Sequence, residues 1–548
     1  MPLSKSVHWV ISSCVLFLLG YTFYYQLGGY ALLNNNEGLY AQIPLEMIES
    51  GNFVIPTLNG NPYIEKPPLL YWLIAGVYKL FGVSEWTSRF VTATAGFLLC
   101  LIGGTFLRLH KFSEGRWLYP LLLGTSIGVI IFSRIVYFDV LLTFFFSLSL
   151  YSFYTWYDRG SKSWLYLSYT SLALAILAKG FLAFVLASLI VGTFLMLDRA
   201  RFKKVLSFLN PGAIFLFLLI VVPWHKLSMS QEKGFAWFYF INEHILRFLD
   251  LREPRDYYHG SFYYYLPRIA GYIFPWTLFL SVLFRSSTPH EPPKLTKFLW
   301  IWFLLVLGFF SFSQAKANYY IVLGLPPLVM LIAIKLESLL STPKSLWILI
   351  SVTVTILLLT GLGVIVYFYD ITSQIRAYKE TLPWMILLYT AVYGLSGLVL
   401  AWFFRKQAFI GIFLLGTLMV PVFFVALQEV KKQEDHISVK NLVLDIPASI
   451  RQTRKHVYLY RDYEALSSTL YYMRRSVPIV ESHSRDLLYG QNNPHQPDSF
   501  LNMNTFEKIL KEQIPVYVIS RDKYQKELEE KGLRVLSKRA GHVLMEHS

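Results

Sequence analysis

The sequence predicts a polytopic α-helical membrane protein with about 13 transmembrane helices, followed by a small α/β domain outside the membrane. Of its 548 residues, 55% are hydrophobic. These residues are concentrated in runs of about 18–24, long enough to cross a hydrocarbon core about 30 Å thick. After about residue 430 the chain becomes charged and has no further spanning run. We therefore expect a transmembrane domain over residues 1–430 and a soluble domain over residues 431–548.

The apolar runs give the expected position of each span. The first run is too long for a signal peptide, and no small-residue cleavage site follows it, so we expect it to be retained. The expected spans are 7–28, 87–109, 116–133, 137–157, 163–178, 180–197, 207–226, 267–285, 297–314, 319–337, 345–368, 383–404 and 407–427.

The distribution of positive charge predicts the orientation. The formal net charge is +16, which in a soluble chain would suggest a nucleic-acid partner. Here many cations fall in short loops between apolar runs, for example Arg199 to Lys204, and such loops remain in the cytoplasm. We expect no nucleic-acid binding, a cytoplasmic N-terminus and, after an odd number of crossings, a C-terminus on the opposite side.

Two outer loops are long, at about 29–86 and 227–266, and loops of this length are usually functional. Both are rich in aromatic residues and proline, which argues against disorder. Within the first loop, apolar residues between Glu37 and Ser50 recur with helical spacing, and Gly51 follows as a stop. We expect this segment to be an amphipathic helix lying on the membrane surface.

The C-terminal region has the alternating pattern of a small α/β domain. Short strand-like runs occur at 456–461, 477–481, 515–521, 533–540 and 542–546. Helical patterns lie between them at 464–474, 505–512 and 523–531. This region contains no recognisable catalytic motif.

The first outer loop holds the most informative polar residues. Glu65 and Lys66 stand between aromatic residues and Pro67-Pro68, immediately before an apolar run. Prolines restrict the backbone, so both side chains are expected to be held in place for a function. Asn36 and Glu37 have two interpretations: catalytic groups, or a helix cap and a carboxylate at the positive end of a helix.

Further ionisable residues fall at the same outer surface. Arg134 and Asp139 lie in a short outer turn, where they could act in catalysis or simply pair with each other. Basic residues that would suit an anionic ligand such as a lipid phosphate also gather here. Glu65 together with His244 or His259 could hold a divalent metal ion, whose identity the sequence does not specify. The remaining outer residues of interest are Lys179, Arg247, Lys316, Tyr319 and Tyr320.

These segments resemble a known family. The segment Tyr63 to Trp72, with Glu65-Lys66-Pro67-Pro68 as its most specific part, is similar to the aminoarabinose (4-amino-4-deoxy-L-arabinose) lipid A transferases. These belong to the GT-C glycosyltransferases, which include the protein O-mannosyltransferases. The likeness covers residues 1 to about 430 and extends to other outer segments: Asn36-Glu37, Tyr40, Arg89, Arg134, Asp139, Lys179-Gly180, Glu243-His244, Arg247-Phe248, Pro275-Trp276 and Lys316 to Tyr320.

The resemblance implies roles for individual residues. Glu65 is similar to the family's metal-binding glutamate, and Asp139 to an acidic active-site residue. Carrier-phosphate ligands are implied or expected at Lys66, Arg247, Tyr63, Tyr320 and Lys316. One departure matters: the family usually has aspartate where this chain has Asn36, and an amide cannot accept a proton at neutral pH. Glu37, Asp139 and Asn36 remain the catalytic candidates.

The expected activity follows from the same resemblance. It implies a GT-C-like enzyme of the bacterial inner membrane, with a periplasmic C-terminal domain and an undecaprenyl-phosphate-linked sugar as donor. Because a phosphate acceptor attacks without a base whereas a hydroxyl normally needs one, Asn36 favours lipid A phosphate over other acceptors. The alternatives are a hexosyl or mannosyl transferase acting on protein or another glycan and, outside enzymes, a transporter of lipid-linked sugars.

Overall fold

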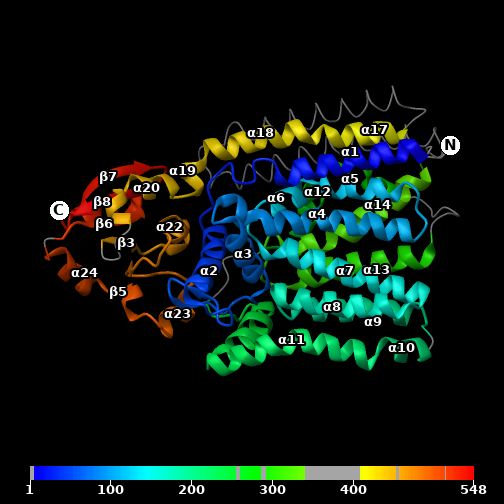
Figure 1. Cartoon of the computed structure of the whole chain (residues 1–548), viewed down its shortest axis with the longest axis horizontal. Helices are drawn as coiled ribbons and strands as arrows, with labels where there is room; N and C mark the ends of the chain where they lie inside the picture. The colour runs from blue at the N-terminus through cyan, green and yellow to red at the C-terminus, as the bar shows by residue number, and fades with distance from the viewer. Residues whose placement is uncertain are drawn as a thin grey trace.

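The computed structural model describes residues 5–200, 202–254, 260–284, 292–339, 408–451, 456–512 and 514–547. Most of the helices run side by side in one elongated bundle, and an α/β domain stands at one end of it (Figure 1). The N-terminus lies at the far end of the bundle, and the C-terminus lies in the α/β domain. Helices α2 and α3 lie between the bundle and this domain.

The bundle helices coincide with the predicted spans. Within the described residues, seven are long and apolar enough to cross a membrane, or eight when a bent pair counts as one span. Thirteen spans therefore stay a prediction, and those at 345–368 and 383–404 lie outside the described residues. The elements are α1 (Lys5–Tyr24), α4 (Glu85–Leu109), α5 (Gly115–Gly124), α6 (Ile127–Ser133), α7 (Phe138–Arg159), α8 (Lys162–Lys179), α9 (Leu182–Leu197), α10 (Phe202–Phe208), α11 (Pro211–Gln231), α12 (Tyr265–Tyr272), η2 (Trp276–Phe284), α13 (Pro293–Phe312), η3 (Tyr320–Gly324), α14 (Leu325–Leu339), α17 (Ala408–Thr417) and α18 (Met419–Lys432).

The bent pair is α5 and α6, which meet at 67°. Thr125 and Ser126 break the helix there, and their hydroxyls donate back to the carbonyls of the preceding turn. The Trp276 indole N–H donates to the Thr125 hydroxyl at 2.9 Å. The Ile127 N–H donates to the Phe274 carbonyl at 3.0 Å. A break in an apolar bundle is tolerated when neighbours satisfy the freed groups in this way.

The first outer loop folds into α2 (Asn36–Ser50), a short hairpin of β1 (Thr57–Leu58) and β2 (Asn61–Pro62), and α3 (Leu69–Phe81). Gly51 ends α2 in the left-handed conformation, as the sequence predicted. The position of α2 at the membrane surface stays a prediction, but the described residues of this helix do not form the solvent-exposed polar face of an amphipathic helix. Its residues from Glu37 to Met47 are buried, because α2 packs against α3 on one side and against the C-terminal domain on the other.

The C-terminal domain contains a six-stranded mixed sheet in the order β5-β4-β3-β6-β8-β7. Its strands from β5 to β6 pair in parallel and those from β6 to β7 are antiparallel. The predicted strands are all present, and β5 was not foreseen. The elements are α19 (Glu434–Ile437), α20 (Lys440–Asp445), α21 (Ala448–Arg451), β3 (Val457–Tyr460), η5 (Tyr463–Leu466), α22 (Ser468–Met473), β4 (Ile479–Val480), α23 (Leu488–Asn492), η6 (Pro497–Ser499), β5 (Phe500–Leu501), α24 (Met503–Leu510), β6 (Val516–Arg521), η7 (Asp522–Tyr524), α25 (Gln525–Glu529), β7 (Arg534–Arg539) and β8 (His542–His547).

Specific hydrogen bonds dock this domain on the first outer loop. The Asn59 side chain exchanges two bonds with the backbone of Val477, at 2.8 and 2.9 Å. Glu46 accepts from the backbone N–H groups of Asn59 and Gly60 and so fixes the hairpin turn. Gly38 packs directly on the backbone of Ser468, where a Cβ would collide. These contacts hold the two parts of the chain together at the level of α2.

A buried ion pair organises the base of the outer loop. The Arg89 guanidinium donates two hydrogen bonds of 2.7 Å to the Glu37 carboxylate, and both side chains are fully buried. Glu37 also accepts the backbone N–H groups of Leu33 and Val136. Arg89 in turn donates to three carbonyls within the α1–α2 connection, those of residues 27, 30 and 31. The pair thus ties α4 to the start of α2 and to the turn before α7.

We predict that Arg89→Met strongly destabilises the protein. It would leave Glu37 buried without its counter-ion, which costs about 3–5 kcal/mol. The measurement is thermal unfolding of the purified protein in detergent. Arg108→Met is the matched control, because Arg108 lies on the same helix and is exposed. An unfolding midpoint for Arg89→Met equal to that of the control would contradict the structural importance of the pair.

Candidate active site

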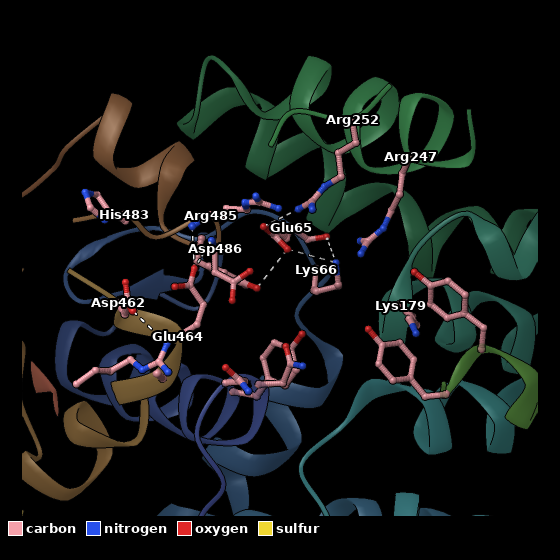
Figure 2. Close-up of a pocket in the computed structure, with 18 residues that line it drawn as sticks. Glu65, Lys66, Lys179, Arg247, Arg252, Asp462, Glu464, His483, Arg485 and Asp486 are labelled. Carbon is pink, nitrogen blue, oxygen red and sulfur yellow. Dashed lines mark hydrogen bonds and ion pairs between the residues drawn. The ribbon is translucent and has the colours of Figure 1, made fainter. Parts of the chain in front are cut away.

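Two cavities meet between the bundle and the C-terminal domain. One is polar, encloses about 540 Å³ and is lined by residues of both parts (Figure 2). The other encloses about 570 Å³ and is lined mainly by apolar side chains of α9, α13 and the second outer loop. The residues common to both walls are Glu65, Lys66, Lys179, Arg247 and Tyr320. A ligand with a polar head and an apolar tail would place its junction at these side chains.

The segment before α3 presents Glu65 and Lys66 to this junction. The hairpin β1–β2 leads directly into it, and the Tyr63 N–H donates to the Pro56 carbonyl at 2.8 Å. The Tyr63 hydroxyl donates to Glu65 at 3.3 Å. Burial raises the pKa of Tyr63 well above its usual range, so the hydroxyl keeps its proton as a donor. The sequence prediction that this segment fixes both charged side chains agrees with the geometry.

Glu243 lies at the centre of a cluster of cations. It belongs to the π-helix η1 (Trp237–Leu246) of the second outer loop. Its carboxylate contacts Lys66 at 3.3 Å, Arg247 at 2.9 Å and Arg252 through the guanidinium Nε. Burial would raise the pKa of Glu243, but Arg252, Lys66 and Arg247 outweigh it and hold the pKa well below its usual range. Glu243 therefore remains ionised and holds these cations together.

Arg252 links the two carboxylates of the cluster and was missed by sequence reasoning. Its Nη2 atom lies 2.9 Å from Glu65 Oε1, while its Nε atom faces Glu243. Figure 2 shows Arg252 and Arg247 pointing from the second outer loop toward Glu65 and Lys66. Arg252 follows η1 in a loop of mixed charge, and the sequence offered no signal beyond its place in that loop.

Asp139 pairs with Lys179 and not with Arg134. The Lys179 ammonium donates to the Asp139 carboxylate and stands 4.7 and 5.0 Å from the ring centres of Tyr319 and Tyr320. Arg134 instead donates to carbonyls at the end of α1, at 2.8 to 3.0 Å. The pairing of Arg134 with Asp139 across the turn is therefore wrong. Lys179 lines both cavities, and its ion pair with Asp139 fixes the position of its ammonium group.

The neighbouring residues Asn36 and Glu37 have different surroundings. Asn36 lines the polar cavity, and its amide donates to the Tyr137 hydroxyl at 2.9 Å, so it is not the expected helix cap. Glu37 is fully buried against Arg89 and two backbone N–H groups. Glu37 lines neither of the two cavities, so the catalytic role predicted for it is not supported by this geometry.

Lys316 also has a different place from the expected one. Its ammonium is buried and donates to the carbonyls of Phe310 and Ser311, at 2.8 and 2.7 Å, where it caps the end of α13. It lines neither of the two cavities. A cation at a helix C-terminus stabilises the helix by completing its unpaired carbonyls. The predicted contact of Lys316 with a phosphate is not supported by this geometry.

The predicted metal ligands Glu65 and His244 both line the apolar cavity and contact other protein groups. His244 Nδ1 lies 2.6 Å from the Tyr239 carbonyl, and its Nε2 accepts the Phe181 N–H at 3.0 Å, so both ring nitrogens are engaged. Gly180 has φ +115° and allows the backbone to pass close to this ring. Glu65 faces Arg252, Tyr63 and Lys66. His259 lies outside the described residues, within which no group of three or more metal-ligating side chains occurs. Among the described residues, the donor atoms of Glu65 and His244 are engaged by protein groups.

The C-terminal domain supplies one wall of the polar cavity, which sequence reasoning missed because the domain carries no motif. Glu464 accepts from the Ser484 hydroxyl and from the Arg485 N–H, and so fixes the loop that carries Asp486. Burial and the nearby carboxylates of Glu65 and Glu464 raise the pKa of Asp486 to about 8. Figure 2 shows Asp486 beside Glu65. The wall consists of Asp462, Glu464, Ala465, His483, Arg485, Asp486 and Arg521.

Comparisons with known proteins agree with this architecture. Residues 6–235 match the family described as dolichyl-phosphate-mannose-protein mannosyltransferase. The chain is 32% identical over 326 residues to an undecaprenyl phosphate-alpha-4-amino-4-deoxy-L-arabinose arabinosyl transferase of Pseudomonas fluorescens. That match covers 58% of this chain and 57% of the relative. A transferase of the same description from Proteus mirabilis is 26% identical over 508 residues, which cover 89% of this chain and 88% of the relative.

The fold is shared with a solved structure. ArnT from Cupriavidus metallidurans in the apo state superposes with a TM-score of 0.83 at 21% identity, covering 100% of this chain and 99% of that one. The same protein bound to undecaprenyl phosphate gives a TM-score of 0.82. The class is thereby defined as a GT-C-type membrane fold. Within that class the chain is similar to the undecaprenyl phosphate-alpha-4-amino-4-deoxy-L-arabinose arabinosyl transferases, in line with the resemblance of its outer segments.

We predict that Asp486 makes stability depend on pH with a defined sign. The folded state binds this proton more tightly than the unfolded chain, so the free energy of unfolding falls as pH rises from about 4 toward 8. Asp486→Asn removes this titration. The difference in unfolding midpoint between the variant and the wild type should therefore grow in favour of the variant between pH 5 and pH 8. A difference that stays constant over this range would contradict the assignment.

Proposed function

We propose that this chain is an inverting glycosyltransferase that moves 4-amino-4-deoxy-L-arabinose, or a similar sugar, from undecaprenyl phosphate to a lipid A phosphate. The observation that carries this proposal is the meeting of a polar and an apolar cavity at Lys66, Lys179 and Arg247. A polyprenyl-phosphate sugar has the matching order of apolar tail, phosphate and polar head. The solved ArnT structure with undecaprenyl phosphate supports the choice of carrier.

The cations at the junction supply the chemistry. The acceptor attacks C1 of the sugar on the face opposite the carrier, and the C1–O bond breaks to release a phosphate monoester. Lys66 and Arg247 lie where charge grows on that phosphate and stabilise the transition state. Lys179, held by Asp139, extends the positive field into the polar cavity. A divalent metal ion at Glu65 and His244 stays a prediction, and the steps above involve only side chains of the chain itself.

A lipid A phosphate is the acceptor that the site suits better. The amide of Asn36 cannot act as a base, and the Asp139 carboxylate is already engaged by Lys179. A phosphate oxygen attacks without prior deprotonation, whereas a hydroxyl normally needs a base. Transfer of a hexose to protein or another glycan is the second candidate, favoured by the family match over residues 6–235. A transporter would place its polar site near the midplane of the membrane, not at one end of the bundle.

The proposal includes a location. We infer a multi-pass protein of the bacterial inner membrane with thirteen spans, a cytoplasmic N-terminus and a periplasmic C-terminal domain. The polar cavity then lies on the periplasmic side, since the C-terminal domain forms one of its walls. Reporter fusions after Ser548 and in the loop between α9 and α10 test this orientation. Reports from the same compartment at both positions would exclude it.

The direct test of function is product formation. Purified protein is incubated with undecaprenyl-phosphate sugars and lipid A, and the mass of the product is measured. We predict that Lys66→Ala or Arg247→Ala abolishes transfer, because each removes a contact to the developing phosphate worth about 2–4 kcal/mol of barrier. Lys233→Ala, at an exposed position of the same outer loop as Arg247, is the control and should retain activity. Near-normal turnover of both site variants would remove the case for this site.

We predict that Asn36→Asp distinguishes the two acceptor classes. With a phosphate acceptor, the new carboxylate stands beside anionic substrates, so transfer should stay equal or fall. With a hydroxyl acceptor, the same substitution supplies a base and should raise the rate about tenfold or more. Paired rates of wild type and variant on both acceptors are the measurement. A clear increase on phosphate alone would contradict the proposed role of position 36.

A further inference from the structure

The second outer loop carries a carboxylate where a phosphate-binding site would be expected to carry cations alone. Glu243 contacts Lys66, Arg247 and Arg252, and its side chain is only 2% exposed. Two of these cations, Lys66 and Arg247, line the junction where the proposed function places the carrier phosphate. Glu243 therefore already binds the groups that the phosphate would need.

The charge of the cluster is informative. Lys66, Arg247 and Arg252 supply three positive charges, and Glu65 and Glu243 supply two negative ones. Glu243 thus offsets one unit of positive charge among these side chains. A sugar phosphodiester donor carries a single negative charge, whereas the released phosphate monoester carries about −1.5 to −2 charges at neutral pH. Each positive charge that Glu243 offsets therefore weakens binding of the monoester more than binding of the donor.

We propose that Glu243 is an internal competitor of the carrier phosphate that matches the site to the donor and promotes release of the monoester product. This inference rests on the proposed function and deepens it. Glu243 makes no contact with the reacting atoms. It acts through Lys66 and Arg247, whose ammonium and guanidinium groups it shares with the phosphate. In the empty site the same carboxylate keeps the three cations from repelling one another.

A purely structural role predicts the opposite result on substitution. If Glu243 only positioned the cations, its neutralisation would let them separate, and the carrier phosphate would bind more weakly. If it competes with the phosphate, its neutralisation raises the net charge of the site by one and the carrier phosphate binds more tightly. The sign of the change in affinity thus separates the two roles.

The experiment measures the affinity of purified full-length protein in detergent for a short-chain polyprenyl monophosphate, by calorimetric titration. Glu243→Gln keeps the shape of the side chain. Its affinity for the polyprenyl monophosphate should be higher than that of wild type by about tenfold or more. Glu243→Asp withdraws the carboxylate by one methylene and should bind with intermediate affinity. Glu253→Gln is the control, since Glu253 is exposed in the same loop and its removal changes the net charge equally. Its affinity should equal that of wild type.

Kinetics provide the second readout. In Glu243→Gln, single-turnover transfer should persist while steady-state turnover falls, because the product leaves slowly, and added carrier phosphate should inhibit more strongly. The uncharged polyprenol should bind all variants alike, whereas inorganic phosphate should show the same order as the carrier. Unchanged or weaker carrier binding by Glu243→Gln overturns the inference. If Glu243→Gln does not fold, unchanged or weaker carrier binding by Glu243→Asp overturns it. Failure of wild type to bind the carrier would instead refute the proposed function.

Discussion

The buried ion pair between Glu37 and Arg89 is the constraint on which the outer part of the molecule depends. A charge without water is stable only when it is paired and hydrogen-bonded, and here the pair is satisfied by bidentate bonds and by five backbone groups. Those backbone groups belong to the α1–α2 connection and to the turn before α7. Asn36 is adjacent to Glu37, and Asp139 lies three residues after Val136, so the positions of both follow from the ion pair.

The site itself is built from segments far apart in the chain. The first outer loop contributes Glu65 and Lys66, the second contributes Glu243, Arg247 and Arg252, and α8 contributes Lys179. The C-terminal domain closes the polar cavity. It also buries Asp486 near the carboxylates of Glu65 and Glu464, and this environment raises the pKa of Asp486. The polar cavity therefore requires the docking of that domain through Asn59, because without it the cavity would lose one wall.

The balance of charge at the junction explains why so many ionisable groups can be buried together. Each cation has a carboxylate within contact distance, and Glu243 and Glu65 are shared between more than one of them. Because the carboxylates are shared, each of these cations has a negative partner although there are fewer carboxylates than cations among the side chains named here. The apolar cavity beside this cluster excludes water from one side, and electrostatic interactions are stronger in such surroundings.

The amino-acid sequence by itself determined the helical membrane architecture, because apolar runs of spanning length have no other stable arrangement in lipid. It also determined the strands of the C-terminal sheet other than β5, and the fixed placement of Glu65 and Lys66 between aromatic residues and prolines. These features depend on local composition, periodicity and backbone restriction, all of which can be read along the chain.

Tertiary structure alone decided which charged side chains meet. Asp139 pairs with Lys179 and not with its neighbour Arg134, and Lys316 caps a helix although its place in the sequence suggested a phosphate ligand. Arg252 and Asp486 enter the site from segments without any motif. The physical reason is that an ion pair depends on distance in space, and tertiary packing brings together residues as far apart in the sequence as Glu65 and Arg252, which are 187 positions apart.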